Sequence, residues 1–169
     1  MVIGVDPGVN GGGKAFMNNI ITIIIPGRPI AKQRPRFVRR GNFIMAYNNQ
    51  ETEEGRWTLE AKSQIKKKLE GPIDVDICFY MLRPKNHFGS GKRQKELKSS
   101  APAWHTSKPD LDNLLKFCLD CLNGLAWDDD RQIVSVIAKK VYGEPRTWIQ
   151  IKIKSVFGYE KKSLDKLKL

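Results

Sequence analysis

Residues 73–82 (IDVDICFYML) combine two kinds of side chain in alternation. One set of alternate positions is apolar (Ile73, Val75, Ile77 and Phe79), and the other is more polar (Asp74, Asp76, Cys78 and Tyr80). Successive side chains of a β-strand point to opposite faces, so this period of two predicts a half-buried strand. A strand with one apolar face has to lie in a sheet that other elements cover, which constrains the fold of the whole chain.

Five other segments have the residue patterns of regular structure. They are strands at Ile20–Ile25, Ile133–Tyr142 and Thr147–Phe157 and helices at Thr52–Leu69 and Asp110–Asn123. The last two strands flank a Gly-Glu-Pro-Arg sequence at 143–146, which predicts a hairpin between them. The order β-α-β-α-β-β indicates an α/β (α+β) fold, a single domain with a mixed β-sheet packed by helices.

A chain of 169 residues has room for one ordinary domain with its own core. We expect that domain at residues 20–158, after an N-terminal extension at 1–19 with a flexible triple glycine and before a basic tail at 159–169. The sequence has no apolar run near the roughly 20 residues of a membrane span, and no secretion signal. Three cysteines without framework spacing favour a reducing cytoplasm.

The charge of the chain indicates its partner. The formal net charge is +12, which favours nucleic acid as the anionic partner, with an anionic membrane surface second. Two long segments, at 28–50 and 83–108, are expected to be loops. Both are basic and almost free of acid, as expected of phosphate contacts. The candidate DNA contacts are Arg28, Lys32, Arg34, Arg36, Arg39, Arg40, Lys92 and Arg93. Phe37, Phe43 and Phe88 lie among them, either as wedges for unpaired bases or, more commonly for such rings, as anchors to the core.

Residues 108–136 hold six of the eighteen carboxylates of this cationic chain. In the expected helix, Asp112, Lys116 and Asp120 share a polar face, and Asp110 stands at the N-cap position. One interpretation is structural: a cap, a first-turn charge, a surface ion pair and a solvated acidic turn at 128–130. In the other, the two groups of carboxylates converge and bind Mg²⁺ or Mn²⁺ for phosphodiester cleavage. These patterns alone leave both interpretations open.

The longer motif in this segment resembles that of a known family. It reads Asp110-Leu111-Asp112-Asn113-Leu114, then Lys116, Asp120, Leu122 and Gly124, then Trp127, Asp129, Asp130, Gln132, Ile133 and Val134. Together with IPGRPIAKQRPRF at 25–37, it resembles the RusA-type Holliday junction resolvases, and their phage-type members in particular. The resemblance spans residues 20–157 and implies a mixed α/β homodimer that cuts four-way DNA junctions with Mg²⁺, for which Mn²⁺ substitutes.

The resemblance also assigns roles to individual residues. It implies catalytic residues at Asp110, Asp112, Lys116 and Asp130, with Lys116 assisting at the scissile phosphate. The implied metal ligands are Asp110, Asp112, Asp129 and Asp130, since the extra acid at Asp128 leaves the register of the triplet open between 129 and 130. The implied setting is the cytoplasm of a bacterial host cell, with DNA as the partner and no membrane.

Two other functions are compatible with the same residues. A non-catalytic protein that binds branched DNA would keep the basic segments and use the aspartates as caps and turns. A related nuclease would act more broadly, on flaps and forks.

Cys118 and Cys121 are expected to be packed thiols rather than zinc ligands. The N-terminal VIGVDPG is similar to the first strand of RuvC-type nucleases, but only that one strand is present, and no catalytic role is assigned to Asp6.

Overall fold

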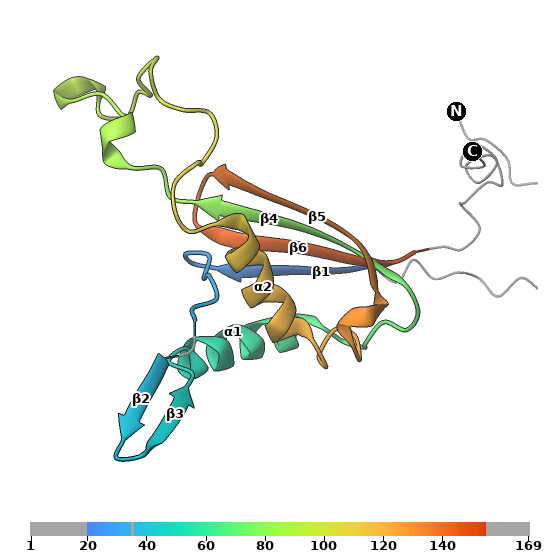
Figure 1. Ribbon diagram of the computed structural model, residues 1–169. Helices are drawn as coiled ribbons and strands as arrows, with labels where there is room; N and C mark the ends of the chain where they lie inside the picture. Colours follow the sequence, from blue (N-terminus) through green and yellow to red (C-terminus); the bar gives the residue numbers. More distant parts are fainter. Residues whose placement is uncertain (1–19, 35, 155–169) are drawn as a thin grey trace, which may run out of the picture.

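The computed structural model describes residues 20–34 and 36–154, with the backbone alone at 36, 40, 44, 46 and 47. The predicted extension at 1–19 and tail at 159–169 lie outside the described residues. The elements (Figure 1) are β1 (Ile20–Pro26), β2 (Arg36–Arg40), β3 (Phe43–Tyr47), α1 (Glu51–Gln64), β4 (Ile73–Met81), α2 (Leu111–Leu122), β5 (Ile133–Tyr142) and β6 (Arg146–Ile153), with short 3-10 turns η1 (Lys85–His87), η2 (Gly91–Arg93) and η3 (Asp130–Gln132). No helix within this range has the length and apolar content to cross a membrane.

Four strands form one sheet in the order β1-β6-β4-β5. β4 pairs antiparallel with β6 and parallel with β5, so the sheet is mixed as predicted. Both helices pack on one face of it (Figure 1), and Trp57 of α1 meets Phe117 of α2 edge to face with ring centroids 6.1 Å apart. The alternate residues of β4 that the sequence selected as apolar lie in this core, each at most 1% exposed. The predicted fold class is confirmed.

The predicted hairpin between β5 and β6 is wrong. β4 lies between these two strands and pairs with both of them. The centre of β4 is buried on both faces, with Cys78 3% and Phe79 0% exposed, so this strand occupies the interior of the sheet. β5 carries exposed residues such as Val134 and Lys139 and takes an edge. The link from β4 to β5 contains α2, and parallel neighbours need a long crossover of this kind.

The helices match their predicted positions with two differences. α1 ends at Gln64 rather than Leu69, because the chain leaves the helix and the Leu69 amide donates to the Ala126 carbonyl at 2.8 Å. α2 lies within one residue of its predicted limits. Its buried face includes Phe117, which the sequence did not select.

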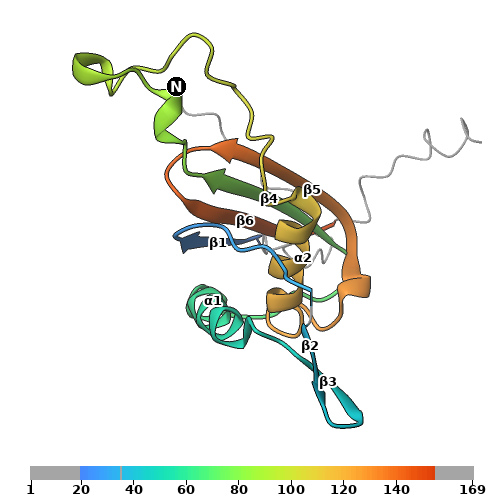
Figure 2. The same ribbon diagram turned by 60° about the vertical axis from the view of Figure 1, so that its left-hand side comes forward.

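The first basic segment was expected to be a loop, and that expectation is wrong for residues 36–47. β2 and β3 pair there as an antiparallel hairpin. Gly41 begins its two-residue turn with a φ of 60°, in the left-handed region that favours glycine. Figure 2 shows the hairpin extending away from the sheet and the two helices.

Candidate metal and nucleic-acid site

The first turn of α2 presents two of the predicted ligands. Asp110 occupies the N-cap position with an extended backbone, and its carbonyl accepts the Leu114 amide at 3.2 Å. Its side chain makes no capping hydrogen bond, so the simple role of a cap is not the one it fills. Asp112 and Lys116, one turn apart, are exposed beside it. The positive end of the helix dipole favours negative charge at this position.

The segment that enters α2 is held from β5. Lys140 Nζ donates to the carbonyls of Ser107 and Pro109, at 2.7 Å each. Sequence reasoning missed this lysine, although a signal exists. Lys140 lies opposite Phe79 in the sheet register, between Ala138 and Tyr142, which both pack against the core. A lysine in that register needs a polar partner, and the two carbonyls before Asp110 supply it.

The acidic triplet lies at the other end of α2. Asp128 pairs with Lys68 at 2.8 Å. Asp129 accepts from both the backbone amide and Nε of Arg131 at 2.9 Å, and the hydrogen bond with this side chain is the main cause that lowers the pKa of Asp129. Asp130 Oδ1 accepts from the indole of the fully buried Trp127 at 2.8 Å.

The length of α2 separates the two groups. The helix has 12 residues, which at about 1.5 Å per residue makes it about 18 Å long. A magnesium ion binds its ligands at about 2.1 Å, so carboxylates at opposite ends of this helix cannot share one. Within the described ranges, no three acidic, histidine or cysteine side chains come together as a metal site. The expected convergence of the two groups does not occur within one chain.

Ion pairing divides the six carboxylates of the acidic segment into two sets. Asp120, Asp128 and Asp129 each pair with a basic side chain. In the part of the chain that the structure describes, Asp110, Asp112 and Asp130 have no basic partner within ion-pairing distance. These are the three aspartates that the resemblance selected as catalytic.

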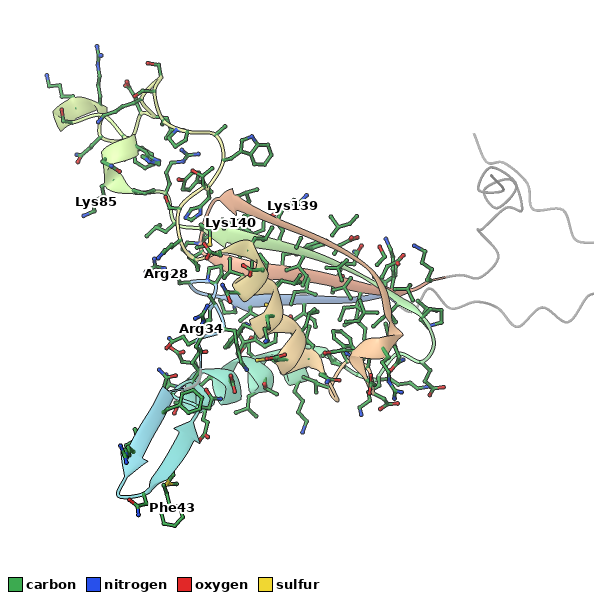
Figure 3. All side chains as sticks on the ribbon, in the orientation of Figure 1. Arg28, Arg34, Phe43, Lys85, Lys139 and Lys140 are labelled. Carbon is green, nitrogen blue, oxygen red and sulfur yellow. The ribbon has the colours of Figure 1, made fainter. Side chains whose placement is uncertain are left out.

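A hollow of about 410 Å³ opens beside Asp110. It is lined by Arg28, Ala31, Lys32, Lys108, Pro109, Asp110 and Asn113. In Figure 3, Arg28 and Lys140 lie on the side of the molecule where α2 begins. Basic groups therefore surround the carboxylate end of α2, as a site for a phosphate backbone requires.

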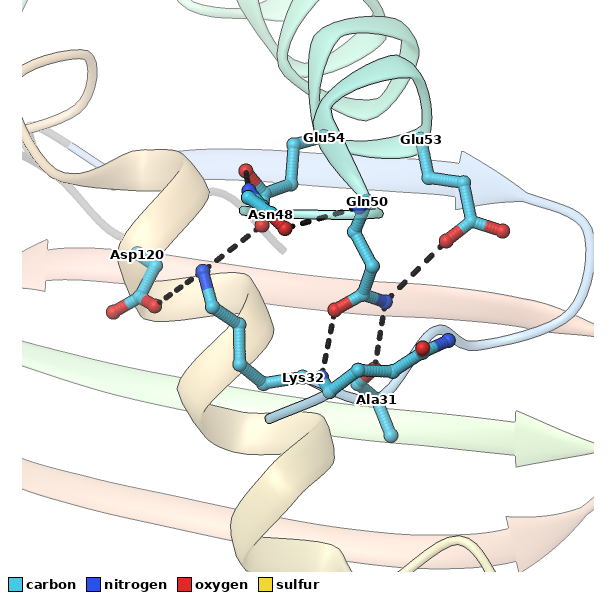
Figure 4. Close-up of polar contacts among 8 residues, drawn as sticks. Ala31, Lys32, Asn48, Gln50, Glu53, Glu54 and Asp120 are labelled. Carbon is cyan, nitrogen blue, oxygen red and sulfur yellow. Dashed lines mark hydrogen bonds and ion pairs between the residues drawn. The ribbon is translucent and has the colours of Figure 1, made fainter. Parts of the chain in front are cut away.

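Lys32, one of the predicted phosphate contacts, is already paired with two carboxylates. Its ammonium lies 2.9 Å from Glu54 and 2.8 Å from Asp120 (Figure 4). Burial by itself lowers the pKa of Lys32, but the hydrogen bonds to the two carboxylates outweigh it and leave that pKa above its ordinary value. Lys32 thus links the basic segment to both helices. Other predicted contacts, Arg28, Arg34, Arg39, Lys92 and Arg93, are exposed, and Arg36 and Arg40 lie on β2.

The paired cysteines of α2 are packed thiols, as expected. Cys118 is 1% and Cys121 8% exposed. Burial raises the pKa of Cys118 well above its ordinary value and that of Cys121 to about 11. Neither thiol is therefore set up for nucleophilic chemistry at neutral pH.

Comparisons with known proteins agree with this picture. The family model described as "Endodeoxyribonuclease RusA" matches residues 26–152. A Bacillus subtilis (strain 168) protein described as "Uncharacterized protein YqaN" is 31% identical over 136 residues, which cover 78% of this chain and 95% of that protein. The family match contains both basic segments and the whole acidic segment.

Proposed function

The chain belongs to the RusA endodeoxyribonuclease family, and on this premise we propose that it resolves four-way DNA junctions by paired, metal-dependent cuts. One observation carries the proposal. In a chain of net charge +12, Asp110, Asp112 and Asp130 have no basic partner among the described residues. Unpaired carboxylates on a DNA-binding surface repel the phosphates, and a bound cation offsets this repulsion.

The donor set suits magnesium, with manganese as a substitute, since carboxylate oxygens are the ligands that these hard cations prefer. When bound, the metal supplies Lewis-acid catalysis of phosphodiester hydrolysis. Asp110 at the N-cap and Asp112 in the first turn of α2 would hold it. Lys116, one turn further along and exposed, contacts the scissile phosphate and offsets its negative charge.

Asp130 is a better ligand than Asp129. The capping of η3 and the contact with the Arg131 side chain engage Asp129 already. The Trp127 indole fixes one oxygen of Asp130, and the other makes no hydrogen bond within the described residues. A buried donor that orients a carboxylate in this way is a common support for a metal ligand.

A homodimer brings the separated aspartates together. β5 is an edge strand with exposed Val134, Val136 and Ile137, at 56%, 38% and 62%. An exposed apolar edge favours pairing with another strand, here the same edge of a second copy. Antiparallel pairing of two β5 strands covers these residues. The same pairing places the start of β5 in one protomer beside the end of β5 in its partner. The start of β5 follows Asp130, and near the end of β5 Lys140 binds the segment before Asp110. Each site then draws ligands from both protomers.

Cleavage of a labelled synthetic four-way junction tests the proposal. We expect paired nicks near the crossover with Mg²⁺, no cutting with EDTA, and no cutting of linear duplex of the same sequences. Flap and fork substrates, run in parallel, separate a strict resolvase from a broader nuclease. Tight binding of the junction without cleavage in Mg²⁺ or Mn²⁺ would instead establish a non-catalytic binding protein.

A further inference from the structure

The β2–β3 hairpin, residues 36–47, is a separate arm of the molecule (Figures 1 and 2). None of its described side chains belongs to the hydrophobic core. Four large apolar residues of the arm are exposed instead: Phe37 (70%), Val38 (43%), Phe43 (77%) and Met45 (56%). Val38, Phe43 and Met45 lie on one face of the hairpin, and soluble proteins rarely leave such an apolar patch exposed without a binding partner.

The root of the arm is held firmly. Before the arm, the Gln33 amide donates to Gln50 Oε1 at 2.6 Å, and Gln50, 1% exposed, donates to the Ala31 carbonyl at 3.0 Å (Figure 4). After it, Asn48 donates to Glu54 at 2.8 Å. The arm is thus presented from a fixed base on α1.

The same root adjoins the candidate metal site. The Lys32 amide donates to the Asn113 carbonyl in the first turn of α2 at 2.9 Å, and the Lys32 side chain reaches Asp120 further along that helix. DNA that enters the hollow beside Asp110 therefore passes the base of the arm.

The charge of the arm selects its partner. Residues 36–47, which form the arm, contain three arginines and no acid. A second copy of this chain, with its net charge of +12, is repelled by such an arm, whereas a polyanion is attracted. A partner that offers both negative charge and flat apolar surface is DNA whose bases are unstacked.

We propose that the arm opens the branch point of the junction, with Phe43 stacking on an unpaired base; this rests on the proposed function. Phe43 follows the turn at the tip of the arm (Figure 3), and it is the most exposed of the apolar side chains that the structure describes there. In the strand register Val38 lies opposite Met45, and both side chains are on the same face of the hairpin as Phe43. These two apolar side chains therefore lie beside the inserted Phe43 ring. Every base offers a π-face, which makes this contact independent of sequence.

The test uses four-way junctions with 2-aminopurine at the crossover and the full-length protein carrying Asp112→Asn, so that cutting does not intervene. Binding is expected to raise the fluorescence as the base unstacks. Phe43→Ala should abolish most of this rise and weaken junction binding at least about fivefold, while duplex binding stays unchanged. Phe43→Trp, which keeps a stacking ring, should behave like the parent.

Leu59→Ala serves as the matched control, because Leu59 is an apolar residue 68% exposed on α1, outside the arm. It should leave fluorescence and affinity unchanged. If Phe43→Ala behaves like the parent in both fluorescence and affinity, the inference is overturned. It is also overturned if Phe43→Ala converts a dimer to a monomer in sedimentation, because the arm would then contact a second copy of the chain. Wild-type protein that cuts the junction keeps the proposed function intact in either case. Wild-type protein that neither binds nor cuts it refutes both.

Discussion

The side chain of Asp112 is exposed on the first turn of α2. Within the described residues it accepts one hydrogen bond, from the side-chain Nδ2 of the neighbouring Asn113 at 3.4 Å. Asp112→Asn keeps the size of the side chain and removes its charge. We expect junction cleavage to fall at least about a hundredfold, because a ligand and its charge are lost. Junction binding should persist or tighten, because a carboxylate no longer repels the phosphates.

Cleavage rates, binding titrations and thermal unfolding of this variant separate its roles. Asp112 is exposed and has no buried partner, so the loss of its charge at the helix N-terminus should lower the melting temperature by at most about 4 °C. Binding that disappears together with cleavage would show that Asp112 supports the structure rather than the chemistry. Lys116→Met is a useful companion, since it should slow cleavage while metal binding remains.

At the residue scale, the sequence could not rank the three neighbouring acids of the triplet at 128–130. Asp128 is engaged by Lys68, sixty residues earlier in the chain. Asp129 caps η3, and Asp130 is oriented by Trp127. Three adjacent identical acids look alike in the sequence. Lys68 is distant in the sequence and Trp127 is buried, so only the folded chain reveals the partners of Asp128 and Asp130.

At the scale of elements, the long loop at 83–108 docks on the end of β5 through Tyr142. The rings of His87 and His105 lie 5.4 and 5.0 Å from the Tyr142 ring, and the Arg83 guanidinium lies 4.1 Å from it. Burial, followed by the positive charges of Lys140 and Arg28, lowers the pKa of His105. Protonation of His105 therefore opposes docking of the loop.

This loop should loosen in acid. The pKa of His105 is depressed in the folded protein, so its contribution to stability is fully present above the unfolded value of about 6.5 and is lost as the pH falls through the lower folded value. As the pH falls from 7 to 5, the protection of the backbone amides of 83–108 against hydrogen exchange should decrease relative to that of the β4 amides. His105→Asn should flatten this difference. An equal response in that variant would mean that another group is responsible.

Element prediction succeeded where the pattern of residues is long and regular. β5 was predicted at Ile133–Tyr142, and the structure has the same limits. The β2–β3 hairpin was missed, because its apolar residues are interleaved with arginines and face solvent rather than a core. The hydrophobic alternation that identifies strands arises from burial on one face, which this arm does not have.

At the scale of the whole molecule, the proposed dimer predicts complementation between inactive variants. Protein with both Asp110→Asn and Asp112→Asn, and protein with Asp130→Asn, should each be inactive alone. Mixed under conditions of subunit exchange, they form a heterodimer in which one site carries no substitution and the other carries all three. After random exchange about half of the dimers are heterodimers, and each heterodimer has one intact site out of two. The cleavage rate should therefore return to about a quarter of the wild-type rate.

The cuts themselves provide a second readout. A heterodimer with one intact site should nick a single strand of the junction and yield few paired products. Cross-linking or sedimentation confirms that mixed dimers have formed. If they form and cutting does not return, the ligands do not come from two protomers, and the site must be completed in another way.

The sequence by itself determined the class of fold and the family, and it predicts the chemistry of the site. Periodicity, turn residues and the order of charged side chains are local features of the sequence. They can be recognised without knowing which segments are neighbours in the folded chain. Only the tertiary structure decided that β4 separates β5 from β6, that residues 36–47 project as an arm, and that α2 holds Asp110 and Asp130 apart. Strand neighbours and distances between sites depend on which apolar faces bury each other across the whole chain, and no short stretch of residues contains that information.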